Sequence, residues 1–418
     1  MSRIFVSIAS YRDPDLNPTI RDCIEKASDP SKLSFGIAWQ SDENEKLDLA
    51  ADSRVQYIKI PYRDSQGACW ARSLIQEKFY NGEELYFQLD SHHRFVKDWD
   101  IKLQQYLSSC SSPKPILTTY SPSFDPGNFQ GIEHLSYVPW KIDYWRFVEN
   151  GIIIYRPSTI DNYQQLQKPV PARFISGHML FAKGSFVEEV PYDPNLYFTG
   201  EEMTLSVRAF THGWDLYHPH RVVSWHEYER KYRVKHWDDH IPAKGKNWFE
   251  IDRLSKARCG ELLLKQADLG RHGLGKVRTL RDYERYAGVC FSMRGVESFT
   301  AKHQYPPSPL MHLSDEEWLK SLKQPSEVEA NFSRSQLPSL DSDDSYEFWF
   351  FGCHDENGDE LGRIDLKPAE IESLLRQTGD QLSVYRTFET VRKPATWTIW
   401  PYSKNKKWLS KITSQAKA

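Results

Sequence analysis

The sequence has no long apolar run, no paired-cysteine motif and no strong net charge. No stretch approaches the roughly 18 apolar residues of a membrane span, so we expect no membrane-spanning helix. The six cysteines form no Cys-x-x-Cys pair, which indicates reduced thiols in a cytoplasmic protein. Lys plus Arg (54) nearly balance Asp plus Glu (57), giving a charge of −3. We therefore expect no nucleic-acid partner unless a local basic patch exists.

The composition is that of a folded protein with more than one domain. At roughly 150 residues per domain, 418 residues predict two or three domains. Hydrophobic residues (39%) suffice for a core, which excludes a disordered chain. Aromatic residues reach 14%, with 14 Trp and 22 Tyr. Flat aromatic faces suit sugar rings or bases, although filling of the core explains the composition equally well.

The first ninety residues alternate between strand and helix patterns. The amino end is too short for a signal peptide, and its apolar run predicts a first strand. Repeated strand–helix–strand units predict an α/β fold with a mostly parallel sheet covered on both faces. Ligands of such sheets bind at the carboxyl ends of the strands. Strands are predicted at residues 4–8, 33–39, 55–60 and 85–89, and helices at 20–27 and 71–79.

Later composition predicts the domain organisation. Residues 110–170 are rich in Pro, Tyr and Trp without a clear period, which fits either a loop framing a substrate or a surface insertion. The basic end, residues 404–411, predicts a solvated tail. The predicted parts are a catalytic domain (1–240), a helical extension packed on it (241–321), a linker rich in Ser, Pro, Asp and Asn (322–344) and a small β-rich accessory domain (345–418).

The sequence Asp90-Ser91-His92 follows a predicted strand. Residues two apart at a strand end point the same way, so the carboxylate and the imidazole converge. That pair suits Mn²⁺ or a similar divalent ion, which can clamp a diphosphate and neutralise the leaving group. A capping Asp beside a surface His is the simpler alternative. A third ligand could come from His226, with His218 and His220 as competing candidates.

Two arginines and two glutamates are further candidates. Arg12 and Arg72 could contact phosphate or uracil, because a guanidinium matches phosphate oxygens in pairs, but solvated arginines are common. Glu201 and Glu202 could position an acceptor hydroxyl or stabilise positive charge developing on a sugar ring. Both glutamates open a predicted helix, so compensation of its dipole would explain them equally well.

These motifs, taken in order, resemble the family of GlcNAc-transferases that includes the enzymes modifying hydroxyproline on the ubiquitin-ligase subunit Skp1. The resemblance spans roughly residues 1–290. It rests on Ile8-Ala9-Ser10-Tyr11-Arg12-Asp13, Ala71-Arg72, Gln88-Leu89-Asp90-Ser91-His92-His93-Arg94-Phe95, Val190-Pro191-Tyr192-Asp193-Pro194, Gly200-Glu201-Glu202, Arg208, Thr211-His212-Gly213-Trp214-Asp215, His226-Glu227-Tyr228, Gly273-Leu274-Gly275 and Arg278-Thr279-Leu280.

The resemblance implies a GT-A fold, Rossmann-like and nucleotide-sugar-binding, and a DXD-like metal motif of the Asp-x-His type. It implies a retaining, metal-dependent glycosyltransferase that moves a sugar, GlcNAc by preference, from a UDP-sugar donor to a hydroxyl acceptor on a protein or glycan. The motif is also similar to that of the polypeptide GalNAc-transferases, whose third metal ligand is a later His. The implied residues are Asp90, His92 and His226 for Mn²⁺ or Mg²⁺, Ala9, Ser10, Tyr11, Arg12, Arg72, Asp90, Ser91, Ser176 and Gly177 for the nucleotide-sugar, and Asp90, Glu201 and Glu202 for catalysis.

Two departures from the family pattern limit what it implies. His93 stands where the pattern has Thr, and the segment after residue 322 has no counterpart in the Skp1 enzymes. The Skp1 acceptor is therefore not carried over, and the last segment could bind acceptor, form a homodimer or cover an apolar face. The alternative functions are a UDP-Gal- or UDP-GalNAc-dependent transferase of polysaccharide synthesis, an inactive transferase-like module that binds carbohydrate or protein, and a metal hydrolase or nuclease, against which the near-neutral charge argues.

Overall fold

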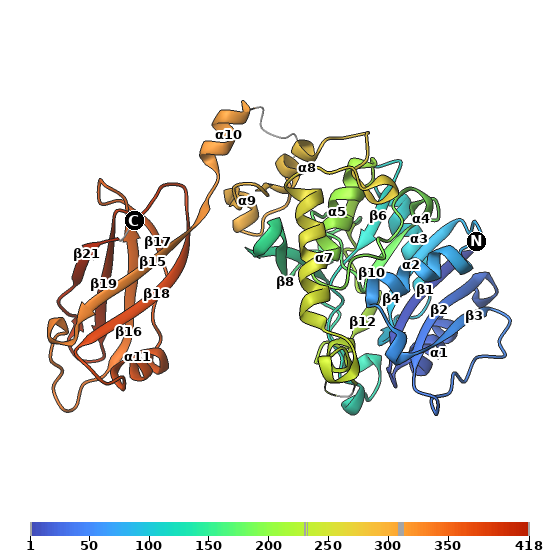
Figure 1. Cartoon of the computed structure of the whole chain (residues 1–418), viewed down its shortest axis with the longest axis horizontal. Coiled ribbons are helices and arrows are strands. Elements are labelled where there is room, and N and C mark those ends of the chain that lie inside the picture. The colour runs from blue at the N-terminus through green and yellow to red at the C-terminus, as the bar shows by residue number, and fades with distance from the viewer. Residues whose placement is uncertain (1, 230, 232, 308–312, 417–418) are drawn as a thin grey trace. The chain divides into compact units, whose positions relative to one another are not determined.

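The computed structural model describes residues 2–229, 231, 233–307 and 313–416, and its contacts divide the chain into two compact units (Figure 1). The first unit comprises residues 1–287 and 299–310, and the second comprises residues 288–298 and 311–418. Within the described ranges, no helix combines the length and apolar character that crossing a bilayer requires.

The first unit is built on an eight-stranded sheet in the order β3-β2-β1-β4-β10-β6-β11-β9. β1 runs parallel to β2 and β4, and β6 runs parallel to β11, whereas β10 and β9 run antiparallel to their neighbours. The α/β class predicted from the sequence is confirmed. The bounds are β1 (Ile4–Tyr11), β2 (Leu33–Ser41), β3 (Val55–Pro61), β4 (Leu85–Asp90), β6 (Pro115–Thr118), β9 (Val170–Pro171), β10 (Met179–Lys183) and β11 (Asp215–His218).

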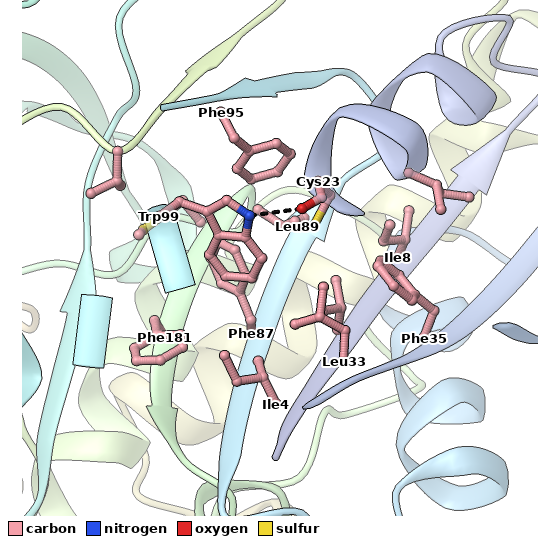
Figure 2. Packing of buried hydrophobic residues seen from close by; sticks show 14 of the residues in the cluster. Ile4, Ile8, Cys23, Leu33, Phe35, Phe87, Leu89, Phe95, Trp99 and Phe181 are labelled. Carbon is pink, nitrogen blue, oxygen red and sulfur yellow. Dashed lines mark hydrogen bonds between the residues drawn. The ribbon is translucent and has the colours of Figure 1, made fainter. Parts of the chain in front are cut away.

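The central strands are almost continuously apolar because both faces of the sheet are covered. β4 is buried from Leu85 to Leu89, and residues of both its faces reach the core. Figure 2 shows one such layer, in which the Trp99 ring lies 5.0 Å from the Phe87 ring, centroid to centroid. The indole Nε1–H of Trp99 donates to the carbonyl oxygen of Cys23 at 2.8 Å, so this large side chain is buried without an unpaired donor.

Helices and two short ladders complete the first unit. Helix α2 packs against β1 and β2, and α3 packs against β6. The ladders pair β5 (His93–Phe95) with β12 (Ser224–His226) and β7 (Trp140–Phe147) with β8 (Ile153–Thr159). The helices are α1 (Leu16–Lys26), α2 (Ala68–Phe79), α3 (Trp99–Ser109), α4 (Phe186–Glu189), α5 (Glu201–Thr211), α6 (His236–Asp239), α7 (Trp248–Leu263), α8 (Leu280–Ala287) and α9 (Ser298–Ala301), whose first residue belongs to the second unit.

The strand order places a topological switch between β1 and β4. From β1 the chain adds β2 and then β3 on one side, and then places β4 on the other side of β1. Connections leave β1 and β4 in opposite directions, which opens a crevice at their carboxyl ends. The register sets Asp90, the last residue of β4, opposite Ala9 of β1. Asp90 and the predicted nucleotide contacts at the end of β1 therefore meet at this edge.

The second unit is mainly β-structure around its own core, which includes Trp349, Phe351 and Trp397. A five-stranded sheet joins β17, β16, β19, β20 and β21, and β15 pairs with β18 over ten residues. The bounds are β13 (Val289–Cys290), β14 (Gly295–Val296), α10 (Asp315–Ser321), β15 (Gln324–Ser333), β16 (Tyr346–His354), β17 (Glu360–Arg363), α11 (Pro368–Leu375), β18 (Gln381–Thr390), β19 (Thr396–Ser403), β20 (Lys407–Trp408) and β21 (Ile412–Gln415).

Two segments of this unit differ from the prediction. Residues 322–344, predicted to be a linker, contain strand β15, because Val328, Ala330 and Phe332 alternate along it and enter the core. Residues 404–411, predicted to be a solvated tail, contain β20, which pairs with β19. In β15 the polar residues between the apolar positions face outward, which is why composition alone suggested irregular structure. Both residues of β20 are exposed, so this segment is solvated although it pairs with β19.

Candidate functional site

The three predicted metal ligands come together at the switch between β1 and β4. One ligand atom each from Asp90, His92 and His226 can be chosen such that all lie within 4.8 Å of one another. Nε2 of His226 lies 3.4 Å and Nε2 of His92 lies 3.7 Å from Oδ2 of Asp90. Both imidazoles are buried, whereas Asp90 is partly accessible. One carboxylate and two imidazoles suit a first-row divalent ion.

The pairing of β5 with β12 brings His226 to the site across 136 residues of sequence. His226 lies opposite His93 in this ladder, directly after His92. The competing candidates lie elsewhere in hydrogen-bonded or stacked positions. His218 contacts the carbonyl oxygen of Thr118 through Nδ1 and accepts from a backbone amide through Nε2, and the His220 ring packs against Tyr106. Of the three histidines considered for the third ligand, only His226 faces Asp90.

Asp13 fixes the orientation of His92, a role that the sequence reasoning missed. Its buried Oδ2 lies 2.7 Å from Nδ1 of His92 and accepts from the Ser91 hydroxyl at 2.6 Å. Burial opposes ionisation of Asp13, but His92 and Arg233 lower its pKa below the ordinary value. A charged Asp13 holds the proton of His92 on Nδ1 and leaves Nε2 as the ligating atom. Ser91, which was predicted to contact the nucleotide-sugar, thus uses its hydroxyl for a hydrogen bond to Asp13.

Arg72 fixes Asp90 from the opposite side. It is buried, donates to Oδ1 of Asp90 at 2.7 Å, and bonds Oε1 of Glu201 through its other terminal nitrogen. Burial opposes the charge of Arg72, but Glu201 holds its pKa well above the ordinary value. Burial likewise opposes the charge of Asp90, whose pKa is nevertheless lowered well below the ordinary value by His226 and Arg72. Arg72 is therefore placed to orient the carboxylate of Asp90, and its predicted contact with the nucleotide-sugar stays a prediction.

Glu202 points into the largest cavity of the site. Gly177 donates its backbone N–H to Oε1 of Glu202 at 2.7 Å, and burial, followed by Glu201, raises the pKa of Glu202 to about 7. Gly177 has no room for a side chain, because a Cβ there would lie 2.7 Å from Oε1 of Glu201. Ser176 contacts Nδ1 of His178 through its hydroxyl at 2.9 Å, so it supports a neighbouring imidazole.

The cavity beside the metal cluster has a volume of about 630 Å³. Its lining combines polar side chains, among them Asp90, Glu201, Glu202 and His226, with apolar side chains, several of which come from β8. Such a volume accommodates a small ligand whose orientation is set by a few polar groups. Its remaining lining residues are Arg72, Tyr120, Ser123, Trp140, Ile152, Ile153, Ile154, Tyr155, Pro157, Gly177, His178, Phe198, Thr199, Gly200, Met203, Tyr228 and Glu229.

The residues after β1 line the other side of the switch. The Tyr11 hydroxyl and the Arg12 guanidinium both donate to Oδ2 of Asp239 at 2.9 Å. Arg12 has a φ of 45°, a left-handed conformation in which its side chain turns toward Asp239. Asp239 borders a further cavity of about 270 Å³. Ser10 is fully buried, and its predicted contact with the nucleotide-sugar stays a prediction.

Arg233 contacts the cluster from the segment after β12. One terminal nitrogen of its guanidinium lies 2.9 Å from Nε2 of His92, and its Nε donates to Oε2 of Glu227 at 3.2 Å. Nε2 of His92 is the nitrogen that would bind a metal. Binding of a metal ion by His92 therefore requires Arg233 to move, and nothing in the sequence pattern had singled out this arginine.

A sheet of this order, with a carboxylate–histidine cluster at its topological switch, is typical of enzymes that bind nucleotides at the edge of the sheet. The family model described as Glycosyltransferase (GlcNAc) matches residues 3–54 and 42–293. These residues make up more than half of the chain, so the chain belongs to this family of glycosyltransferases. The resemblance inferred from the sequence motifs is thereby confirmed.

Other comparisons find more distant similarity. No curated protein matches the chain. Among solved structures, GalNAc-T7 with UDP, GalNAc and Mn²⁺ is 14% identical with a TM-score of 0.43, covering 68% of this chain and 54% of that chain. TarS 1–349 of S. aureus in complex with UDP-GlcNAc is 9% identical with a TM-score of 0.38, covering 64% and 68%. The chain thus spans about half the length of the GalNAc-T7 chain.

Proposed function

We propose that this glycosyltransferase uses a divalent metal ion to transfer a sugar from a UDP-sugar to a hydroxyl of a protein or glycan. The observation that carries the proposal is the convergence of Asp90, His92 and His226 at the switch between β1 and β4. GlcNAc is the proposed sugar, and its support is the description of the matching family. The proposed ion is Mn²⁺, because a carboxylate with two imidazoles is a mixed oxygen and nitrogen ligand set.

The residues present fit such an ion. Asp90 presents Oδ2 toward both imidazoles, and Asp13 keeps the proton of His92 on Nδ1, so Nε2 carries the lone pair that becomes a ligand once Arg233 moves away from it. When bound, the ion would neutralise the negative charge of a diphosphate leaving group. Nδ1 of His226 makes no hydrogen bond within the described part of the chain, so this ring is positioned by the contact of its Nε2 with Asp90 and by packing against His178, whose ring centroid lies 4.1 Å away.

The other residues of the site bind and orient the substrates in this proposal. Tyr11 and Arg12 would contact the nucleotide, since they end β1 beside the cluster and share Asp239 as a partner. Glu201 holds Arg72 and through it Asp90. Glu202, which lines the cavity, would accept a hydrogen bond from a hydroxyl of the sugar or acceptor. With a pKa of about 7, it would exist in both protonation states near neutral pH.

The test is release of UDP from a panel of UDP-sugars, with and without Mn²⁺ and after chelation by EDTA. One donor, UDP-GlcNAc, should be hydrolysed slowly without an acceptor, and EDTA should abolish this activity. Asp90→Ala and His226→Ala should each reduce it by more than about 100-fold, since even loss of an outer-shell contact costs 10- to 100-fold.

The matched control is His134→Ala, because His134 is an exposed histidine of the same unit, with a side chain 62% accessible. It should leave hydrolysis unchanged. Full activity of the Asp90 variant, or activity resistant to EDTA, would contradict the metal assignment. Preference for UDP-Gal or UDP-GalNAc would contradict the choice of sugar while leaving the metal assignment intact.

A further inference from the structure

The five-stranded sheet of the second unit carries aromatic side chains on the side opposite its core. Phe348 and Phe350 of β16, Trp400 and Tyr402 of β19 and Trp408 of β20 form this aromatic face. The rings of Phe348 and Tyr402 stack with centroids 4.9 Å apart, and those of Trp400 and Trp408 lie 4.3 Å apart. The five side chains therefore form one aromatic cluster across three strands, in which Phe350 is buried and Trp408 is exposed. Figure 1 shows strands β16 and β19 of this sheet.

The fold of this unit does not require the aromatic face. The alternate residues of the same strands, Trp349, Phe351, Trp397 and Ile399, point the other way and are buried in the core. Trp408, by contrast, remains 41% exposed on a strand only two residues long. Trp408 thus extends the aromatic cluster into solvent, and apolar patches of this kind mark binding sites.

Cationic side chains border this face. The Lys407 ammonium lies 5.6 Å from the Tyr402 ring centroid, and the Lys411 ammonium lies 5.9 Å from that of Trp400. Among the residues that the structure describes, no carboxylate pairs with either lysine. Residues 391–416 contain six Lys or Arg and no Asp or Glu, although the whole chain has a net charge of −3. Lys407 and Lys411 thus place positive charge beside the rings of Tyr402 and Trp400.

We propose that the aromatic face binds a glycan chain that bears carboxylates. The flat rings offer stacking surfaces to the apolar faces of pyranose units, and the two lysines offer partners to carboxylates. Hydroxyl partners for the sugar lie on the same face, where Oγ1 of Thr398 and Oγ1 of Thr413 are 3.0 Å apart. This inference goes beyond the proposed transfer reaction, because binding here requires neither donor nor metal.

Two other occupants fit the face less well. A second copy packed symmetrically would bring Lys407 and Lys411 close to the same residues of its partner, and like charges repel. Nucleic acid carries a dense row of phosphates and requires many cations. Here, however, Lys406 is already paired with Asp341 at 2.9 Å and Arg363 with Asp365 at 2.6 Å. A glycan with widely spaced carboxylates matches the few available cations.

The test is isothermal titration of the full chain, without donor, with a hyaluronan decasaccharide as the acidic probe. The matched neutral probe is the same oligosaccharide after reduction of its carboxylates to alcohols. The acidic probe should bind, and the neutral probe should bind at least about tenfold more weakly. Trp408→Ala should weaken binding of the acidic probe at least about tenfold, since exposed tryptophans in binding sites contribute strongly. The double variant Lys407→Gln/Lys411→Gln should weaken it and reduce its dependence on salt.

Tyr385→Ala is the matched control, because Tyr385 is an aromatic residue 52% exposed on β18, in the other sheet of the same unit. It should leave binding unchanged, and all variants should have the far-UV circular dichroism and the urea unfolding transition of the wild type, which verifies that the second unit is folded. Absence of binding, or equal affinity in the Trp408 variant, would overturn the proposal. So would tighter binding of an oligothymidylate, or a dimer that dissociates on the Trp408 substitution.

Discussion

The contact between Asp13 and His92 gives the most specific prediction. In Asp13→Asn the amide oxygen would keep its hydrogen bond from the backbone N–H of Asp15, which lies 2.9 Å from Oδ1 in the wild type. The amide nitrogen would then replace Oδ2 and face Nδ1 of His92. Since an amide nitrogen only donates, His92 would shift its proton to Nε2 and lose the lone pair that binds metal.

The expected magnitude follows from the loss of one outer-shell partner. Mn²⁺ affinity should fall about 10- to 100-fold, which equals roughly 1.4 to 2.8 kcal/mol. Isothermal titration with Mn²⁺ in the presence of UDP measures this loss, and hydrolysis of the donor should fall in parallel at limiting Mn²⁺. Rotation of the amide would restore the contact with His92 only by losing the hydrogen bond from Asp15.

A buried aspartate away from the cluster provides the control. Asp100 accepts from the backbone N–H groups of Ser28 and Asp29 at 2.8 and 3.1 Å. Asp100→Asn should therefore lower the free energy of unfolding but leave Mn²⁺ affinity unchanged. If Asp13→Asn binds Mn²⁺ as tightly as the wild type, the carboxylate does not set the orientation of His92 and the reasoning fails.

Three further predictions concern the carboxylates around Arg72. The pKa of Glu202 rises from 4.5 to about 7 on folding, so the folded state binds more protons between these values and the free energy of unfolding falls as the pH rises through them. Glu202→Gln should abolish this loss of up to about 3 kcal/mol, measured by urea unfolding at pH 5 and pH 8. If the variant and the wild type show the same pH dependence, the prediction is refuted. Arg72→Ala should cost about 3–5 kcal/mol in urea unfolding by leaving the buried Glu201 and the partly accessible Asp90 without their cation, and Arg72→Lys should cost less. Gly177→Ala should cost about 1–3 kcal/mol in the same assay, because its Cβ would lie 3.0 Å from a terminal nitrogen of Arg72, and unchanged stability would contradict this crowding.

The sequence predicted the parts of the fold that depend on local periodicity. The apolar runs of β1 and β4 and the helical spacing within α1 and α2 were sufficient to predict an α/β sheet with polar residues at its edge. The pair Asp90 and His92 followed from the same argument, since both lie at the end of one strand. The long-range partner could not be chosen this way, because the ladder of β5 and β12 that selects His226 over His218 depends on tertiary pairing.

The residues that support the site were harder to predict. Asp13 and Arg233 act through contacts with His92 from segments that differ greatly in sequence position. Ser10 and Ser91 belong to the recognised motifs, yet one is buried in the interior and the other bonds Asp13. Proximity to a motif therefore did not reveal which way a side chain points.

The error at β15 has a different cause. Val328, Ala330 and Phe332 alternate with polar residues, which is the period of a half-buried strand. The Ser, Pro and Asp residues around them are typical of a linker, and the prediction followed this composition instead of the alternation of only three apolar residues. Periodicity was the better guide here, because the partner strand β18 supplies the apolar surface that the segment lacks.

The ladder that joins β5 to β12 has a consequence for biosynthesis. The three clustered side chains are complete only after the chain has extended past residue 226, although β1 and β4 are synthesised within its first ninety residues. A fragment that stops before β12 would be able to form the early strands and the Asp90–Arg72 ion pair, yet would possess only two of the three ligands. Late-forming, non-local contacts of this kind are gained slowly and lost readily. A frameshift in the intervening stretch, which removes β12, should therefore eliminate the proposed cation site while leaving the residues of the early strands in place.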